Sequence, residues 1–343
     1  MKRKLIIHVG MGKTGSSSIQ KTLRMARPQL KEAGILYLGL MLEHTKLSGN
    51  LSWHQVSGWR DYLKEHAKGS DIANRQLSDA FAELDAYLPE SIHTLVWSNE
   101  SLFDSIQLVR PALQAISQHM DIQVVGYIRR PDTWITSAYL QWGIKHKTYK
   151  GPLKSFSVWS KDMPYVVYSK ASSWHALVEN SWFANFDAIP DVSEHFLKSL
   201  WPDIAPGIPM QRENDTPSPA AMALFALHNS LSVGQVLPSE IEPLLIKAGL
   251  VGEMQKSHPY NQLLPEQADV ITYVENNWEE VERINALMKE MGQPEFDVST
   301  PRFKDYSTSQ LDINRAMMEL IVSLAREVDR LKSRLDAQES RND

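Results

Sequence analysis

The stretch that decides the fold is Leu5–Gln20, with the sequence LIIHVGMGKTGSSSIQ. It begins with an apolar run of strand length, passes through a turn rich in glycine, lysine and hydroxyl residues, and continues into a helical pattern. Glycines allow a tight turn of the backbone, and the free amides at the start of the following helix attract an anion. The stretch therefore predicts a strand, a phosphate-binding turn and a helix, in that order.

The turn offers a positive charge and hydroxyl donors to a bound phosphate. It differs from the Walker A loop, in which lysine directly follows the second glycine. Here Ser16 follows Gly15, and the lysine lies two residues before that glycine. The residues that we predict to hold the phosphate groups are Gly12, Lys13, Thr14, Gly15, Ser16, Ser17 and Ser18.

Apolar runs of strand length recur after the first one, with helical patterns between them. They lie at residues 5–9, 35–38, 92–97 and 122–128. Alternating strands and helices predict a three-layer α/β fold, with a mainly parallel central sheet and helices on its faces. Ligands of such sheets bind beyond the carboxyl ends of the strands. Lys13, Glu100 and Arg129 each follow a predicted strand, so we expect them to converge at that edge.

A second motif follows the fourth apolar run. Arg129 ends that run, Pro131 lies two residues further on, and Ser137 and Tyr139 lie eight and ten residues after the arginine. Proline is tolerated in the first turn of a helix, so we expect the strand to give way to a helix near Pro131. Ser137 then lies about two turns along that helix, where it and Arg129 can face one phosphate.

Together the two motifs resemble the sulfotransferases that use 3′-phosphoadenosine 5′-phosphosulfate, in particular bacterial members and carbohydrate or heparan sulfate sulfotransferases. The first matches the phosphosulfate loop, Lys-Thr-Gly followed by two hydroxyl residues, and the second matches the 3′-phosphate motif. The resemblance covers residues 4–230 and implies a P-loop-like fold and sulfuryl transfer. Lys13 suits the position where the leaving phosphate gains negative charge, and the resemblance assigns Arg129 and Ser137 to the 3′-phosphate. Arg212 resembles a residue of a late loop near the nucleotide.

Sulfuryl transfer to a hydroxyl also needs a base, and the sequence offers two. His44 follows the second apolar run, where histidine-dependent heparan sulfate sulfotransferases place a histidine, and an unperturbed imidazole accepts a proton near neutral pH. Glu100 resembles the glutamate of a Ser-Xaa-Glu element in bacterial members. The choice between them stays open. The arrangement requires no metal, and the sequence shows no obvious cluster of metal ligands.

Composition limits the class of protein. The chain has 343 residues, of which 43% are hydrophobic, and can bury a full core. Its net charge of −5 argues against a nucleic-acid binder that relies on a basic surface. The absence of cysteine excludes disulfides, iron–sulfur clusters and thiolate zinc sites. Since no apolar run is long enough for a signal peptide or a membrane anchor, we expect a soluble, cytoplasmic protein.

The chain divides into a large domain and a terminal helix. We expect a sulfotransferase-like α/β domain over residues 1–308, in which the aromatic-rich segment 151–212 forms a lid or an acceptor-binding wall. The amphipathic helix over 309–343 carries apolar residues at alternating spacings of four and three, typical of a coiled coil. A homodimer through this helix and a helix packed on its own domain both fit the pattern. The spaced residues are Met317, Ile321, Leu324, Val328, Leu331 and Leu335.

Two other functions fit parts of the sequence. A P-loop small-molecule kinase or nucleoside triphosphatase would use Glu100 as the acidic residue after its third strand and would depend on magnesium. The lysine that such a loop needs after Gly15 is missing. A non-enzymatic assembly protein is disfavoured because the phosphate-binding elements are intact. The expected partners are therefore the nucleotide donor and a hydroxyl acceptor. A glycan is favoured over a lipid, a peptide tyrosine or a small alcohol.

Overall fold

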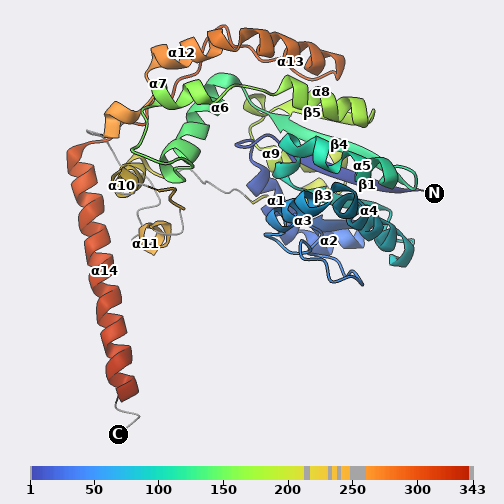
Figure 1. Ribbon diagram of the computed structural model, residues 1–343, viewed down its shortest axis with the longest axis horizontal. Helices are drawn as coiled ribbons and strands as arrows, with labels where there is room; N and C mark the ends of the chain where they lie inside the picture. The colour runs from blue at the N-terminus through green and yellow to red at the C-terminus, as the bar shows by residue number, and fades with distance from the viewer. Residues whose placement is uncertain (1, 212–216, 231–233, 238–240, 248–259, 340–343) are drawn as a thin grey trace. The chain divides into compact units, whose positions relative to one another are not determined.

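The computed structural model describes residues 2–211, 217–230, 234–237, 241–247 and 260–339 (Figure 1). The chain forms two compact units, which we describe separately. The sheet unit consists of Met1–Arg130, Tyr165–Glu213 and Asn277–Asp297. The helical unit consists of Pro131–Pro164, Asn214–Asn276 and Val298–Asp343.

The sheet unit holds a five-stranded sheet in which every pair of neighbouring strands is parallel. The order is β2-β3-β1-β4-β5, and the first four strands in the chain confirm the four predicted apolar runs. The fifth strand was not predicted, because it lies in the aromatic-rich segment, which shows no clean periodicity. The strands are β1 (Arg3–Gly10), β2 (Ile35–Gly39), β3 (Thr94–Ser98), β4 (Met120–Ile128) and β5 (Ser181–Asn185).

Helices cover both faces of the sheet, as expected for an α/β fold. Ile19 and Phe196 pack in one buried cluster with strand residues such as Val96. Phe81 contacts the neighbouring strand residue Trp97, whose side chain points to the opposite face. The helices of this unit are α1 (Ser16–Met25), α2 (Arg27–Glu32), α3 (Trp59–Lys68), α4 (Ser70–Tyr87), η1 (Glu100–Ser105), α5 (Ile106–Ile116), α8 (Tyr168–Leu177), η4 (Phe186–Ala188), α9 (Val192–Leu200), η5 (Ala205–Gly207) and α13 (Trp278–Glu290).

The helical unit begins where the fourth strand ends. Its first helix starts at Pro131, as predicted, and the helix that starts at Pro219 is capped by Ser218, whose Oγ accepts a hydrogen bond from the Ala221 amide at 3.2 Å. Among the described residues, no helix is both long and apolar enough to cross a membrane. The helices are α6 (Pro131–Ala138), the π-helix η2 (Tyr139–Lys145), α7 (Phe156–Trp159), η3 (Ser160–Asp162), α10 (Pro219–Ser230), α11 (Glu242–Lys247), η6 (Tyr260–Leu263), α12 (Gln267–Asn276) and α14 (Gln310–Glu339).

The strand order singles out one point on the carboxyl edge of the sheet. From β1 the chain passes to β2 on one side, and from β3 it crosses over β1 to β4 on the other side. In open parallel sheets, ligands bind at the carboxyl edge where successive connections diverge in this way. The turn after β1 and the loops after β3 and β4 therefore mark the place where a site is expected.

Candidate active site

The turn between β1 and α1 has an unusual backbone. Lys13 and Gly15 have positive φ angles of 72° and 76°, a region that residues other than glycine rarely adopt. The buried hydroxyl of Thr14 donates to the carbonyl of Met11 at 2.6 Å, so Thr14 closes the turn on itself. The amide of Ser18 donates to the carbonyl of Gly15 at 3.0 Å and starts α1. The turn thus leads directly into the amino end of a helix.

Two buried polar atoms without hydrogen-bond partners lie next to Gly10. They are Oγ of Ser16, the first residue of α1, and Nε2 of His8 in β1. A Cβ atom placed on Gly10 would lie 2.2 Å from the first and 3.6 Å from the second, so both face the space beside this glycine. An unsatisfied buried hydroxyl costs about 1–3 kcal/mol. Ser16 and the amino end of α1 therefore fit an anionic oxygen that accepts from both.

His8 brings a neutral hydrogen-bonding group beneath the turn. Its ring is fully buried, its Nδ1 lies 2.7 Å from Oγ of Ser98, and it meets the rings of Tyr127 and Phe196 edge to face. Burial lowers the pKa of His8 to about 3, so the imidazole is neutral at pH 7. A neutral imidazole has one donor and one acceptor nitrogen, and Nε2 can serve a group held at Ser16.

The buried imidazole predicts how stability depends on pH. Since the pKa of His8 is about 3 in the folded chain and 6.5 in the unfolded chain, the unfolded chain binds the proton more tightly. The contribution of the neutral His8 side chain to the free energy of unfolding is fully present above pH 6.5. It falls by about 1.4 kcal/mol per pH unit as the pH drops toward 3. We expect His8→Asn to flatten this slope in urea unfolding measured at several pH values. His93→Asn, at an exposed histidine, is the control, and equal slopes in the two variants would contradict the prediction.

Arg129 connects the turn to the end of β4. Its Nη1 donates to the carbonyl of Lys13 at 3.1 Å, and its Nε lies 3.6 Å from Oδ1 of Asp187. The guanidinium lies 5.2 Å from the centre of the Phe186 ring, and the hydroxyl of Tyr165 donates to the Arg129 carbonyl at 2.6 Å. Arg129 directly follows β4, as predicted, and fixes two loops of the carboxyl edge to each other.

Glu100 lies beside α1. It begins η1 two residues after the end of β3, and Nε2 of Gln20 donates to its Oε2 at 2.6 Å. The main-chain amide of the preceding residue, Asn99, donates to the main-chain carbonyl of His8 at 3.1 Å. These contacts place the start of η1 beside β1 and α1, at the carboxyl edge of the sheet.

His44 lies in the loop after β2, in a turn held by its neighbour. The carboxylate of Glu43 accepts from the amides of Leu40 and Met41 at 3.1 and 2.8 Å. Nε2 of His44 is buried without a hydrogen-bond partner and lies 4.0 Å from Oε1 of Glu43. Burial lowers the pKa of His44, and the positive charge of Arg27 lowers it further. His44 is therefore neutral at pH 7 and has a nitrogen with the capacity to accept a proton.

His44 lies near the buried ring of Tyr37. The rings of Tyr37 and His44 are 5.5 Å apart. Burial raises the pKa of Tyr37 above its ordinary range, and the negative charges of Glu43 and Glu100 raise it further. Glu100 contacts α1 through Gln20, whereas the positive charges that act on His44 come from Arg27 of α2 and from Arg24 in the last turn of α1, so the approach of His44 to the phosphate-binding turn stays a prediction.

The remaining predicted site residues differ in how far they are buried and in the unit to which they belong. Ser17 is exposed in the first turn of α1, while Gly12 and Ser18 are half-buried. Ser137 lies on α6 in the helical unit, so its approach to the phosphate beside Arg129 stays a prediction. Arg212 lies outside the described residues.

Three residues of the site were not predicted from the sequence. His8 left a signal, because it is the one polar residue inside the apolar run of β1. Gln20 lies four residues after Ser16 and therefore on the same face of α1. Asp187 follows the unpredicted strand β5, and nothing in its local sequence points to Arg129.

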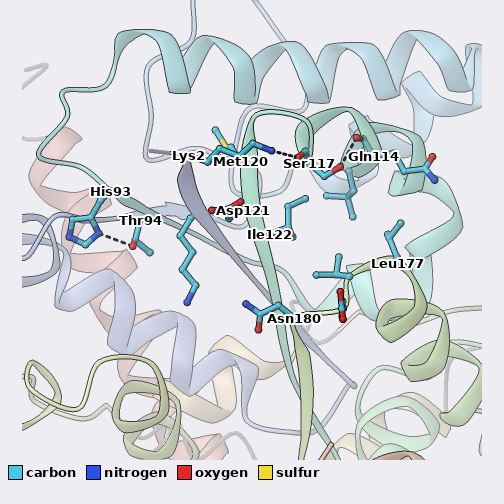
Figure 2. Close-up of a pocket in the computed structure, with 14 residues that line it drawn as sticks. Lys2, His93, Thr94, Gln114, Ser117, Met120, Asp121, Ile122, Leu177 and Asn180 are labelled. Carbon is cyan, nitrogen blue, oxygen red and sulfur yellow. Dashed lines mark hydrogen bonds between the residues drawn. The ribbon is translucent and has the colours of Figure 1, made fainter.

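A pocket of about 870 Å³ lies at the opposite edge of the sheet (Figure 2). Lys4, Thr94 and Asp121, near the amino ends of three strands, help to line it. The side chain of Lys2, labelled in Figure 2, donates through Nζ to the main-chain carbonyl of Ser117 at 3.1 Å. Because ligands of parallel sheets bind at the carboxyl ends of the strands, this pocket is a weaker candidate than the turn after β1, despite its size.

The carboxyl edge thus gathers two cations, two base candidates and an unpartnered hydroxyl on an α/β sheet that is parallel throughout. Lys13 and Arg129 are directly linked through the carbonyl of the lysine. Comparison with protein-family models and with curated protein sequences finds no match for this chain.

Proposed function

We propose that this chain is a sulfotransferase that moves a sulfuryl group from 3′-phosphoadenosine 5′-phosphosulfate to an acceptor hydroxyl, with a glycan as the favoured acceptor. One observation carries the proposal: the buried, unpartnered hydroxyl of Ser16 at the amino end of α1, directly after the turn that holds Lys13. The hydroxyl of Ser16, the amides at the start of α1 and the charge of Lys13 together suit the binding of an anion. The resemblance of residues 13–17 to the phosphosulfate loop supports a phosphosulfate as the anion.

Each step of the proposed sulfuryl transfer is assigned to one or two groups of the chain. The acceptor oxygen attacks sulfur, the bond from sulfur to the bridging phosphate oxygen breaks, and 3′-phosphoadenosine 5′-phosphate leaves. Lys13 and the amides of α1 stabilise the negative charge that grows on the leaving phosphate. Arg129 holds the 3′-phosphate and so orients the nucleotide, and the resemblance assigns Ser137 to the same phosphate. A base takes the proton of the acceptor hydroxyl as the new bond forms.

His44 is the first candidate for that base. Its Nε2 is buried, has no hydrogen-bond partner, and belongs to a neutral imidazole at pH 7. Glu100 accepts a hydrogen bond from Gln20 at 2.6 Å, which holds one of its carboxylate oxygens against α1. Glu100 is therefore assigned the second place, as a group that orients the acceptor or the base.

The direct test is transfer from a labelled phosphosulfate donor across a panel of glycans, lipids, tyrosine peptides and small alcohols, with and without a magnesium chelator. Chelator-resistant transfer to a hydroxyl acceptor is the expected result. Transfer to none of them, together with magnesium-dependent turnover of ATP, would instead support a P-loop kinase or nucleoside triphosphatase. The position of Glu100 after β3 and beside α1 is the observation that keeps this second function open.

Arg129→Ala is expected to weaken binding of 3′-phosphoadenosine 5′-phosphate by roughly 10- to 100-fold, because a charge-assisted hydrogen bond to the 3′-phosphate is lost. Ser137→Ala should cost less, about 3- to 10-fold. Binding of adenosine 5′-phosphate, which lacks the 3′-phosphate, should change little in either variant. Calorimetry with both nucleotides measures the difference.

A matched control separates phosphate binding from the support that Arg129 gives to the turn. Arg129→Lys keeps the charge but loses the fork that contacts the Lys13 carbonyl and approaches Asp187. It should retain part of the preference for the 3′-phosphorylated nucleotide. Equal losses for both nucleotides in Arg129→Ala and Ser137→Ala would remove these residues from the 3′-phosphate.

A further inference from the structure

The last helix of the helical unit is covered at its start and exposed beyond it. Ile313 and Ala316 of α14 are buried, and this helix packs against α10 and α11. Figure 1 shows the red α14 extending past those two helices. Five large apolar side chains further along are between 38% and 55% exposed. They are Met317, Ile321, Leu324, Val328 and Leu331.

These five side chains form one stripe, which we call the seam. They follow one another at spacings of four, three, four and three residues. A repeat of 3.5 residues keeps the stripe facing a partner helix that supercoils with it. The helix runs from Gln310 to Glu339, about 45 Å at 1.5 Å per residue, so the seam extends over several turns.

We infer that α14 pairs through this seam with α14 of a second copy of the chain, in a parallel two-stranded coiled coil. In heptad terms Ile321 and Val328 occupy a positions, while Leu324 and Leu331 occupy d positions. β-branched residues at a combined with leucine at d favour two parallel strands over trimers and tetramers. The choice of residues in the seam therefore selects both the number and the direction of the helices.

Charges beside the seam fit the same arrangement. In a parallel pair, a residue at position g lies opposite the residue at position e that is five places further along the other helix. The sequence places Glu327 at g and Lys332 at e, so these two heptad positions carry opposite charges. Arg334 at g and Glu339 at e repeat the opposition with the signs reversed. Both g–e pairs are attractive, which favours a second copy of this chain as the partner.

The mass of the full chain in solution tests the inference. We expect light scattering to give roughly twice 39.0 kDa, with dissociation on dilution. Leu324→Asp should shift the chain to the monomer mass, because the charge falls in the seam. Val322→Asp is the matched control, since Val322 is 45% exposed but lies one position beside the seam, and it should stay dimeric. Circular dichroism checks that both variants keep the wild-type helix content.

Direction is tested by cross-linking, which the absence of native cysteine makes clean. In a parallel pair Ile321 faces Ile321 of the second copy, so Ile321→Cys should give a disulfide-linked dimer on oxidation, and Val322→Cys should not. Glu327→Lys and Lys332→Glu should each weaken self-association, whereas a mixture of the two variants should form a heterodimer. A monomeric wild-type chain, a dimer that survives Leu324→Asp, or a dimer that Ile321→Cys fails to link would overturn the inference.

Discussion

Lys13→Ala is expected to lower turnover about 100- to 1,000-fold and to leave the fold intact. The lysine charge acts where negative charge develops on the leaving phosphate, so its loss raises the barrier of the chemical step. The backbone should tolerate the change. Lys13 already has a φ of 72°, and its contact to Arg129 uses the main-chain carbonyl, which alanine retains. Turnover at saturating donor and acceptor measures the effect.

An exposed lysine outside the turn supplies the control for that result. Lys31 is exposed on α2, and Lys31→Ala should keep wild-type turnover. Circular dichroism and the unfolding midpoint of both variants should match those of the wild-type chain. Turnover of Lys13→Ala at the wild-type level would contradict the phosphosulfate assignment itself, because no other side chain of the turn carries a positive charge.

The part of the fold that the sequence predicts is the part built from continuous runs of apolar residues. The first four strands are continuous apolar runs because parallel strands are buried on both faces, and such runs are visible without a structure. β5 mixes serine, asparagine and aromatic residues and becomes a strand through its pairing with β4. The helical spacing after the turn was also visible, but not its division into α1 and α2 around Ala26.

The predictable part of the site is the part that follows from topology. Lys13, Glu100 and Arg129 each follow a parallel strand, and carboxyl ends of parallel strands share one edge. The contact of Arg129 with Asp187 depends on β5 and η4, so it required the structure. The unpartnered Oγ of Ser16 also required it, because orphaned polar atoms are defined by what surrounds them in space.

His44→Ala is expected to lower turnover by roughly 100-fold or more while donor binding is preserved, because a general base contributes on this scale. The wild-type rate should fall as pH drops and the imidazole takes up a proton. Burial and Arg27 lower the pKa of His44, so the midpoint of this low-pH limb should lie below 6.5. The limb should be absent in His44→Ala. Rates and nucleotide affinities measured across the pH range test these points.

Two further variants locate the group that titrates. Arg27→Gln removes the positive charge that lowers the pKa of His44, so the low-pH limb should move upward toward 6.5. Glu100→Gln should lose less turnover than His44→Ala and keep the limb, as fits a residue that orients the acceptor. Glu100 would instead be the base if the low-pH limb of the rate profile persists in His44→Ala, disappears in Glu100→Gln and does not move in Arg27→Gln. The charge on Arg27 thus distinguishes the two candidates without altering either of them.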